Sequence, residues 1–212
     1  MLTRISVLAG LAEELRRNEY PLAERWSLVH EWFERRVALP GFRARLREYL
    51  RALPADRAGA VANRSRETTT HFAWCLLDEP DDPFSFWLNE YKPQRDWQRG
   101  YADSVHNHRY HFCTTILSGS YLHERFDVRL DSETGLIASA RLRRRTVAEE
   151  GSAGMLLASD FHRIPRAVDN TMTFLVKSRP VYDSSLSYDP VTGTGRRHVP
   201  VESRLGELTE RI

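Results

Sequence analysis

The sequence predicts a mainly β fold, a barrel or sandwich of short strands, with a helical extension at its N-terminus. From about residue 65 onward, β-branched and aromatic runs alternate with turn residues, and no helical pattern separates them. Before that point, apolar residues recur every three or four positions. We therefore expect a helical extension over residues 1–60 that packs on a β domain over residues 61–212, which ends in a loop and tail.

The helical extension is predicted from this apolar spacing. Leucines within residues 8–15 share one face of a first helix, and Pro21 suits the first turn of a second. The pair Pro40-Gly41 interrupts the pattern, which resumes in FRARLREYLRAL and stops at Pro54. The sequence therefore predicts three short helices.

Strand candidates follow as short runs bounded by turn residues. In chain order they are TTTHFAWCLL, FSFWLNEY, SVHNHRYHF, CTTIL, SYLHERFDVRL, LIASARLRRRTV, GMLLAS, HRIPRAV and MTFLVKS. The tail from Val181 is expected to be a loop with at most one more strand. The arginines in ARLRRRTV, residues 141–145, could form a patch for an anionic partner, but we interpret them as the solvated side of a strand or hairpin.

The composition excludes several classes of protein. The 212 residues hold 31 basic and 29 acidic side chains, a net charge of +2 that argues against a dedicated nucleic-acid binder. No apolar run approaches the ~20 residues of a membrane span, and we find no signal peptide. The two cysteines form no disulfide framework. We expect a cytoplasmic protein with a small-molecule partner; association into a homodimer through sheet edges is left open.

Three of the eight histidines lie close together in GYADSVHNHRYHFCTTILSG. His106 and His108 are two residues apart, so on a strand their side chains leave the same face and can reach one ion. Two ligands are too few for zinc or iron, and a third has to come from elsewhere. His162, after the turn at Ala158–Asp160, is the candidate.

This arrangement resembles the two-part signature of the cupin superfamily over roughly residues 65–185. The first motif fits at Gly100, His106, His108 and Gly119, and the second fits at Gly151 and His162. Phe112 or Cys113 stands where the motif's glutamate would be, and Leu157 and Ser159 replace a proline and a glycine. The resemblance implies a cupin double-stranded β-helix, or jelly-roll barrel.

In lacking this glutamate, the motif resembles that of the thiol dioxygenases, whose iron is held by three histidines. SVHNHRYHFC and FHRIPRAV…MTFLVKSRPVYDSSLSYDPVTG are similar to segments of cysteine dioxygenase. The resemblance implies that His106, His108 and His162 ligate Fe(II), that O2 is the co-substrate, and that Cys113 takes the place of the family's pocket cysteine.

Other positions depart from the cysteine dioxygenase pattern. Lys177 stands where the family has a tyrosine cross-linked to that cysteine, so the cross-link is not expected. Lys177 could instead donate a hydrogen bond to oxygen or substrate, and Arg66, or Arg64 beside it, could bind a substrate carboxylate. Tyr110, Trp87 and Tyr91 are candidate wall residues, Tyr110 being the one expected to touch substrate.

We therefore expect an iron-dependent oxygenase that acts on a small polar substrate, a thiol or an amino acid. One alternative is a zinc, nickel or manganese cupin that catalyses isomerisation or hydrolysis, which needs a nearby base such as Glu90 or Glu124. Another is a non-catalytic cupin that binds a small molecule. Imidazole ligands alone do not choose among these metals.

Overall fold

The computed structural model describes residues 6–18, 24–200, 208 and 211. Four helices come first: α1 (Val7–Arg17), α2 (Trp26–Arg36), α3 (Phe42–Arg51) and α4 (Ala55–Arg64). The prediction of three helices was wrong by one, because Pro54 caps the start of α4 rather than ending the helical region. The helix α4 also crosses the domain boundary expected at residue 60. Pro21 lies outside the described residues.

In the part of the chain that the structure describes, twelve strands and one short 3-10 helix follow, and all strand pairs are antiparallel. They are β1 (Arg66–Glu67), β2 (His71–Leu77), β3 (Phe84–Tyr91), the 3-10 helix η1 (Gln94–Asp96), β4 (Val105–His106), β5 (Phe112–Ser118), β6 (Ser120–Leu130), β7 (Ile137–Glu149), β8 (Ala153–Leu156), β9 (Phe161–Ala167), β10 (Met172–Ser178), β11 (Ser185–Asp189) and β12 (Thr194–His198).

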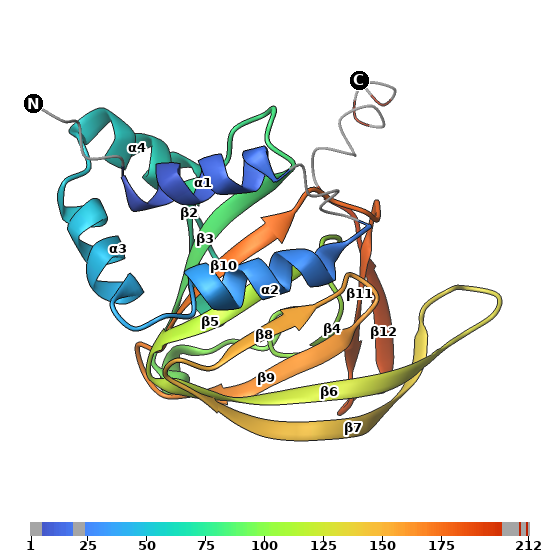
Figure 1. Ribbon diagram of the computed structural model, residues 1–212. Coiled ribbons are helices and arrows are strands. Elements are labelled where there is room, and N and C mark those ends of the chain that lie inside the picture. Colours follow the sequence, from blue (N-terminus) through green and yellow to red (C-terminus); the bar gives the residue numbers. More distant parts are fainter. Residues whose placement is uncertain (1–5, 19–23, 201–207, 209–210, 212) are drawn as a thin grey trace, which may run out of the picture.

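The strands form two six-stranded sheets. One has the order β1-β2-β3-β10-β5-β8 and the other β12-β11-β4-β9-β6-β7. Figure 1 shows the long strands β6 and β7 curving beneath β5 and β10, with the helices on the opposite side. The prediction of a mainly β fold with N-terminal helices is confirmed.

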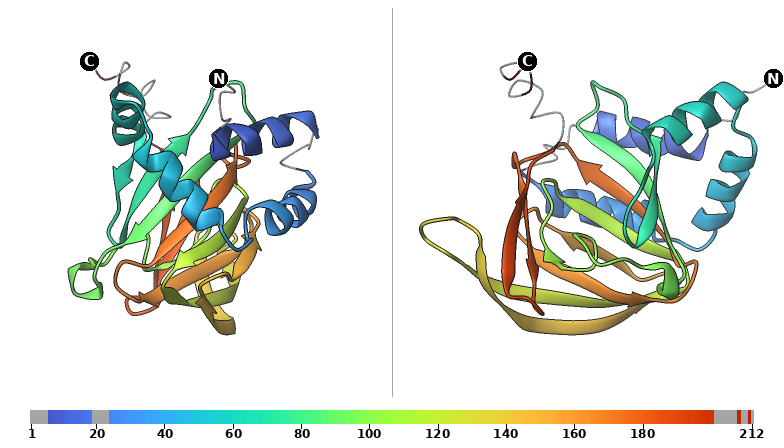
Figure 2. Two further views of the ribbon diagram at one scale, coloured as in Figure 1. Left: turned by 60° about the vertical axis from the view of Figure 1, so that its left-hand side comes forward. Right: turned by 180° about the vertical axis from the view of Figure 1, so that it is seen from behind.

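Side chains of the first sheet alternate between two apolar clusters. Phe174 and Val176 face the helices, where Phe174 contacts the rings of Phe33, Phe42 and Phe86. The residues of the other face point between the two sheets, and Leu175 packs there. The helices therefore share their core with one face of this sheet only, as the turned views of Figure 2 also show.

Two segments near the histidines differ from the expected strands. SVHNHRYHF is not one continuous strand: Val105–His106 forms β4 and Phe112 begins β5, and between them the side-chain amide of Asn107 makes bonds of its own. It donates to the Ala158 carbonyl at 3.0 Å and accepts from the Leu186 N–H at 2.7 Å. The tail forms a hairpin of two strands rather than one, and its first strand, β11, pairs with β4.

The glycine that closes the first histidine motif has a structural reason. Gly119 links β5 to β6 with a φ of 80°, a conformation that other residues rarely adopt. A Cβ at this position would also collide with Thr171, whose hydroxyl donates to the Ser120 carbonyl.

No helix in the part of the chain that the structure describes is long and apolar enough to cross a membrane.

Replacing Phe174 with alanine is expected to lower the free energy of unfolding by about 3–5 kcal/mol, the cost of removing a fully buried phenylalanine. Urea unfolding followed by circular dichroism measures this change. Val191→Ala, at a side chain that is 72% exposed, is the control and should change stability little. Equal stabilities of the two variants would contradict a core shared by the helices and the sheet.

Candidate metal centre

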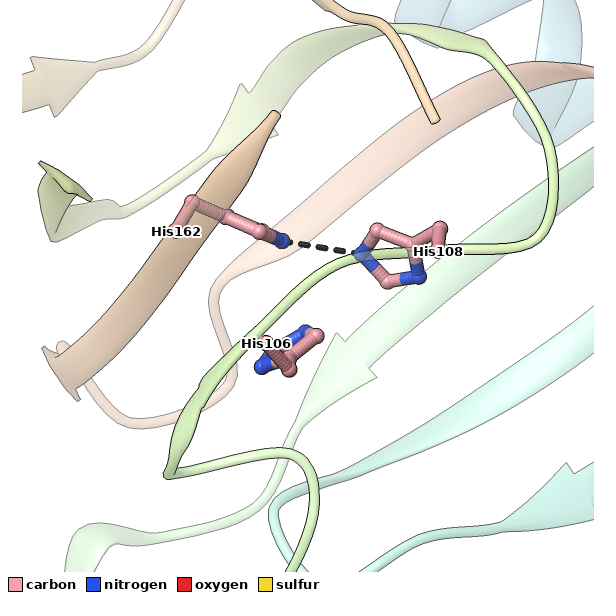
Figure 3. Close-up of side chains that lie close together, drawn as sticks. All are labelled: His106, His108 and His162. Carbon is pink, nitrogen blue, oxygen red and sulfur yellow. Dashed lines mark hydrogen bonds between the residues drawn. The ribbon is translucent and has the colours of Figure 1, made fainter. Parts of the chain in front are cut away.

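Three histidines converge between the two sheets. The strand β4 lies between β9 and β11, and His106 is directly opposite His162 of β9 in the register. His108 follows two residues later, beyond the end of β4. One ligand atom from each ring lies within 4.8 Å of the others, and Figure 3 shows the three rings turned toward one another. The expectation that these histidines meet is confirmed.

The spacing of two of the ring nitrogens fits a shared ion. Nε2 of His108 lies 2.8 Å from Nε2 of His162. With metal–nitrogen bonds of about 2.1 Å, two ligands at a right angle lie about 3.0 Å apart. A single N–H···N hydrogen bond would also explain this pair, but not the approach of His106 as third ligand. The cluster is able to bind a metal ion, and imidazole alone does not identify which one.

Hydrogen bonds orient two of the three rings. Nδ1 of His106 lies 2.9 Å from the Ser104 carbonyl, which only accepts, so this nitrogen carries the proton. Its Nε2 is then free to bind a metal. Nδ1 of His162 lies 3.1 Å from Nε2 of His123, a residue of β6. If His162 binds through Nε2, its Nδ1–H donates to Nε2 of His123, in the place where metal-binding histidines usually have a carboxylate, a backbone carbonyl or water.

Burial keeps these imidazoles neutral, as metal ligands must be. It lowers the pKa of His106 to about 4, against the opposing effect of the Ser104 carbonyl. Burial and the neighbouring histidines lower the pKa values of His108 and His162 well below the usual range. The pKa of His123 falls to about 4, first through burial and then through Arg125 and Arg144.

Aromatic rings fix the positions of the ligands further. The Tyr101 ring packs against His106 with 4.5 Å between ring centroids, and its hydroxyl donates to the Asn107 carbonyl. Tyr110 stacks on His108 at 5.3 Å, and Phe112 meets the same ring edge-on at 5.1 Å. The sequence indicated Tyr110 as a wall residue but gave no signal for Tyr101.

Two positive charges lie beside His108. Lys177 points between the sheets and is only 5% exposed, with Nζ 4.1 Å from the centre of the Trp87 ring and 5.0 Å from that of Tyr110. Arg66 is exposed, and its guanidinium lies 5.4 Å from the Trp87 ring. Within the described ranges, neither forms an ion pair with a carboxylate. We call Arg66, Trp87, Tyr110 and Lys177 the cationic shelf.

The charges of the shelf act on one another. Burial is the main cause that lowers the pKa of Lys177, while the Tyr110 hydroxyl opposes this change. Burial alone would raise the pKa of Tyr110, but Lys177 and Arg66 outweigh it, so the pKa is lowered. The shelf therefore joins a buried positive charge, Lys177, to an exposed one, Arg66, and an anionic group would stabilise both.

The structure places Cys113 away from the histidines. Successive residues of β5 point to opposite faces, so Phe112 lies in the inner cluster and Cys113 in the cluster that faces the helices. Burial raises the pKa of its thiol. The expectation that Cys113 lines the pocket beside the histidines is therefore wrong. The other cysteine, Cys75, is the one that lies beside a residue of the shelf: it is opposite Trp87 in the register, and burial raises the pKa of its thiol to about 11.

The two carboxylates considered as bases bond elsewhere. Glu124 is fully buried beside Arg145 and Arg163, with Arg163 Nε 2.9 Å from its Oε2. Glu90 accepts from the Trp74 indole at 3.1 Å. Neither residue therefore supplies the base that a hydrolytic or isomerising centre would need. No local pattern in the sequence singles out His123 as a functional residue; its position on β6, beside β9, shows only in the folded chain.

Comparison with known proteins gives likenesses of structure only. No family model matches the chain, and no curated protein does. An oxalate decarboxylase variant from Bacillus subtilis is 15% identical, with a TM-score of 0.38 over 56% of this chain and 28% of that one. The formate complex of oxalate decarboxylase from Lactobacillus farciminis is 18% identical, with a TM-score of 0.38 over 56% and 31%. DMSP lyase DddQ from Ruegeria pomeroyi is 16% identical, with a TM-score of 0.41 over 60% and 61%. The chain spans about three tenths of the length of these oxalate decarboxylases.

His123→Ala is expected to weaken metal binding about 10–100-fold, because His162 loses the partner that fixes its tautomer and orientation. Competition with a chromophoric chelator measures the affinity. His123→Gln should retain most of it, since the amide oxygen can accept from His162, and His30→Gln in α2 is the control. Wild-type affinity in the alanine variant would contradict the positioning role.

The metal-free protein is expected to lose stability as the pH falls from 7 to 5. Unfolded histidines take up protons near pH 6.5, whereas folded His106 and His123 do so only near pH 4, and His71 near pH 3. In this window the unfolded state binds more protons, so the equilibrium shifts toward unfolding. Melting temperatures at both pH values measure the effect, and an unchanged value would contradict it.

Proposed function

We propose that the protein is an iron(II)-dependent oxygenase of the cupin superfamily that uses dioxygen to oxidise a small anionic substrate of the thiol or amino-acid type. The observation that carries the proposal is a three-histidine cluster without a carboxylate ligand, placed beside the cationic shelf. The preference for iron comes from the resemblance of the histidine pattern to the thiol dioxygenases.

Charge balance supports an anionic substrate. Three neutral imidazoles leave the 2+ charge of an ion uncompensated, and Arg66 and Lys177 add two further positive charges without carboxylate partners among the described residues. A substrate carboxylate or thiolate would offset part of this positive charge. When bound, the ion supplies the redox chemistry that lets dioxygen react with the substrate.

The residues of the shelf would then act by binding and orientation. Arg66 presents a fork of N–H donors that matches a carboxylate, so it would hold the end of the substrate that faces solvent. Lys177, held against Trp87 and Tyr110, would donate a hydrogen bond to the buried end near His108. Phe112 and Leu156 exclude water from this side of the cluster.

The test is oxygen uptake by the anaerobically purified protein loaded with Fe(II), against a panel of small thiols and amino acids that carry a carboxylate. Arg66→Gln should raise KM about tenfold or more with little change in kcat, because it removes a charge-assisted contact to the substrate. Arg64→Gln is the matched control: Arg64 donates to the Asp78 carbonyl and should leave both constants unchanged.

Two results would overturn the proposal. Binding of these compounds without oxygen consumption would indicate a non-catalytic binding protein. Turnover that persists without oxygen, and with zinc in place of iron, would indicate a hydrolase or isomerase.

A further inference from the structure

A second cationic feature lies on the other side of His162. A cleft of about 390 Å³ opens between β8, at the edge of one sheet, and the β6–β7 pair of the other. Its volume is in the range of small-molecule sites. The residues that line it come from four strands and the turn before β8, and they are Thr114, Tyr121, His123, Arg125, Arg144, Thr146, Val147, Ala148, Ser152, Ala153, Gly154 and Leu156.

Two arginines from neighbouring strands line this cleft, and no acidic residue lines it with them. Arg125 of β6 is directly opposite Arg144 of β7 in the register. Like charges in this position destabilise a pair of strands. Arg145 and Arg141 on the same strand pair with Glu124 and Asp127, whereas Arg144 has no ion pair within the described residues. The lining of the cleft contains no aspartate or glutamate.

Arg125 is held in place at the border of the cleft. Its Nη2 donates to the Met155 carbonyl at 2.5 Å, and its Nη1 lies 3.9 Å from Asp160, which is not among the lining residues. The guanidinium still has N–H groups for a ligand, since it carries five. Thr114, Thr146 and Ser152 add hydroxyl groups to the same wall.

His123 connects the cleft to the metal centre. Its Nε2 faces His162 at 3.1 Å and accepts the proton of that ring when His162 binds a metal through its other nitrogen. Nδ1 of His123 then carries a proton, because a neutral imidazole has one N–H. That N–H belongs to a residue of the cleft wall. A ligand in the cleft is thus separated from the metal ligand by one imidazole ring.

We propose that this cleft is a second anion-binding site, separate from the cationic shelf, that takes a small doubly charged oxyanion between Arg125 and Arg144. The anion offsets the repulsion between the two guanidinium groups and accepts a hydrogen bond from the N–H of His123. Its binding affects the metal centre, because it fixes the His123 ring, which in turn orients His162.

Titration calorimetry of the metal-free protein with inorganic phosphate, in chloride buffer, tests the site without any need for turnover. Phosphate should bind to the wild-type protein, and Arg144→Gln should weaken binding about tenfold or more, since a charge-assisted contact is lost. Arg144 is exposed, so this variant is expected to fold normally. Arg141→Gln, on the same strand but outside the cleft, is the matched control and should bind as the wild type does.

The Co(II)-loaded protein tests the connection to the metal. Phosphate should shift the visible absorption of cobalt in the wild-type protein and in Arg141→Gln, but not at the same concentration in Arg144→Gln. An equal shift in all three would show phosphate bound directly to the metal and would overturn the proposal. So would the absence of phosphate binding to the wild-type protein, a result that leaves the oxygenase proposal untouched.

Discussion

The pairing of β4 with β9 is the constraint on which the centre depends. It sets His106 directly opposite His162, two residues that are 56 positions apart in the sequence. The strand β4 is only two residues long, so contacts from other segments have to hold it in position. The side-chain amide of Asn107 and the tail strand β11 supply this support. A cluster held in this way is formed before any ion arrives, which lowers the cost of ordering the ligands on binding.

Burial gives the same histidines their chemical character. Because the rings are buried, their charged forms are disfavoured and the neutral forms, which bind metals, are stabilised. Lys177 and Arg66 place positive charge beside the neutral rings, and no carboxylate compensates it there within the described residues. The centre is therefore suited to an ion together with an anionic compound.

The sequence predicted the β fold, the helical extension and the three converging histidines, because these depend on local patterns and on one recognisable spacing. It did not predict which face of a strand each residue occupies. Cys113 and Phe112 are neighbours in the sequence, yet the alternation of β5 sends one to the helices and the other to the histidines. His123 and Tyr101 depend on contacts between distant strands and loops, which no local pattern reveals. The cytoplasmic location and the homodimer stay predictions.

X-ray absorption at the metal edge of the purified, reconstituted protein, combined with metal analysis, tests the central claim most directly. One ion per chain with three imidazole nitrogens at about 2.1 Å is the expected result, and His162→Ala should abolish it. A protein that takes up no ion, or one whose bound ion has fewer than three imidazole ligands, would contradict the account.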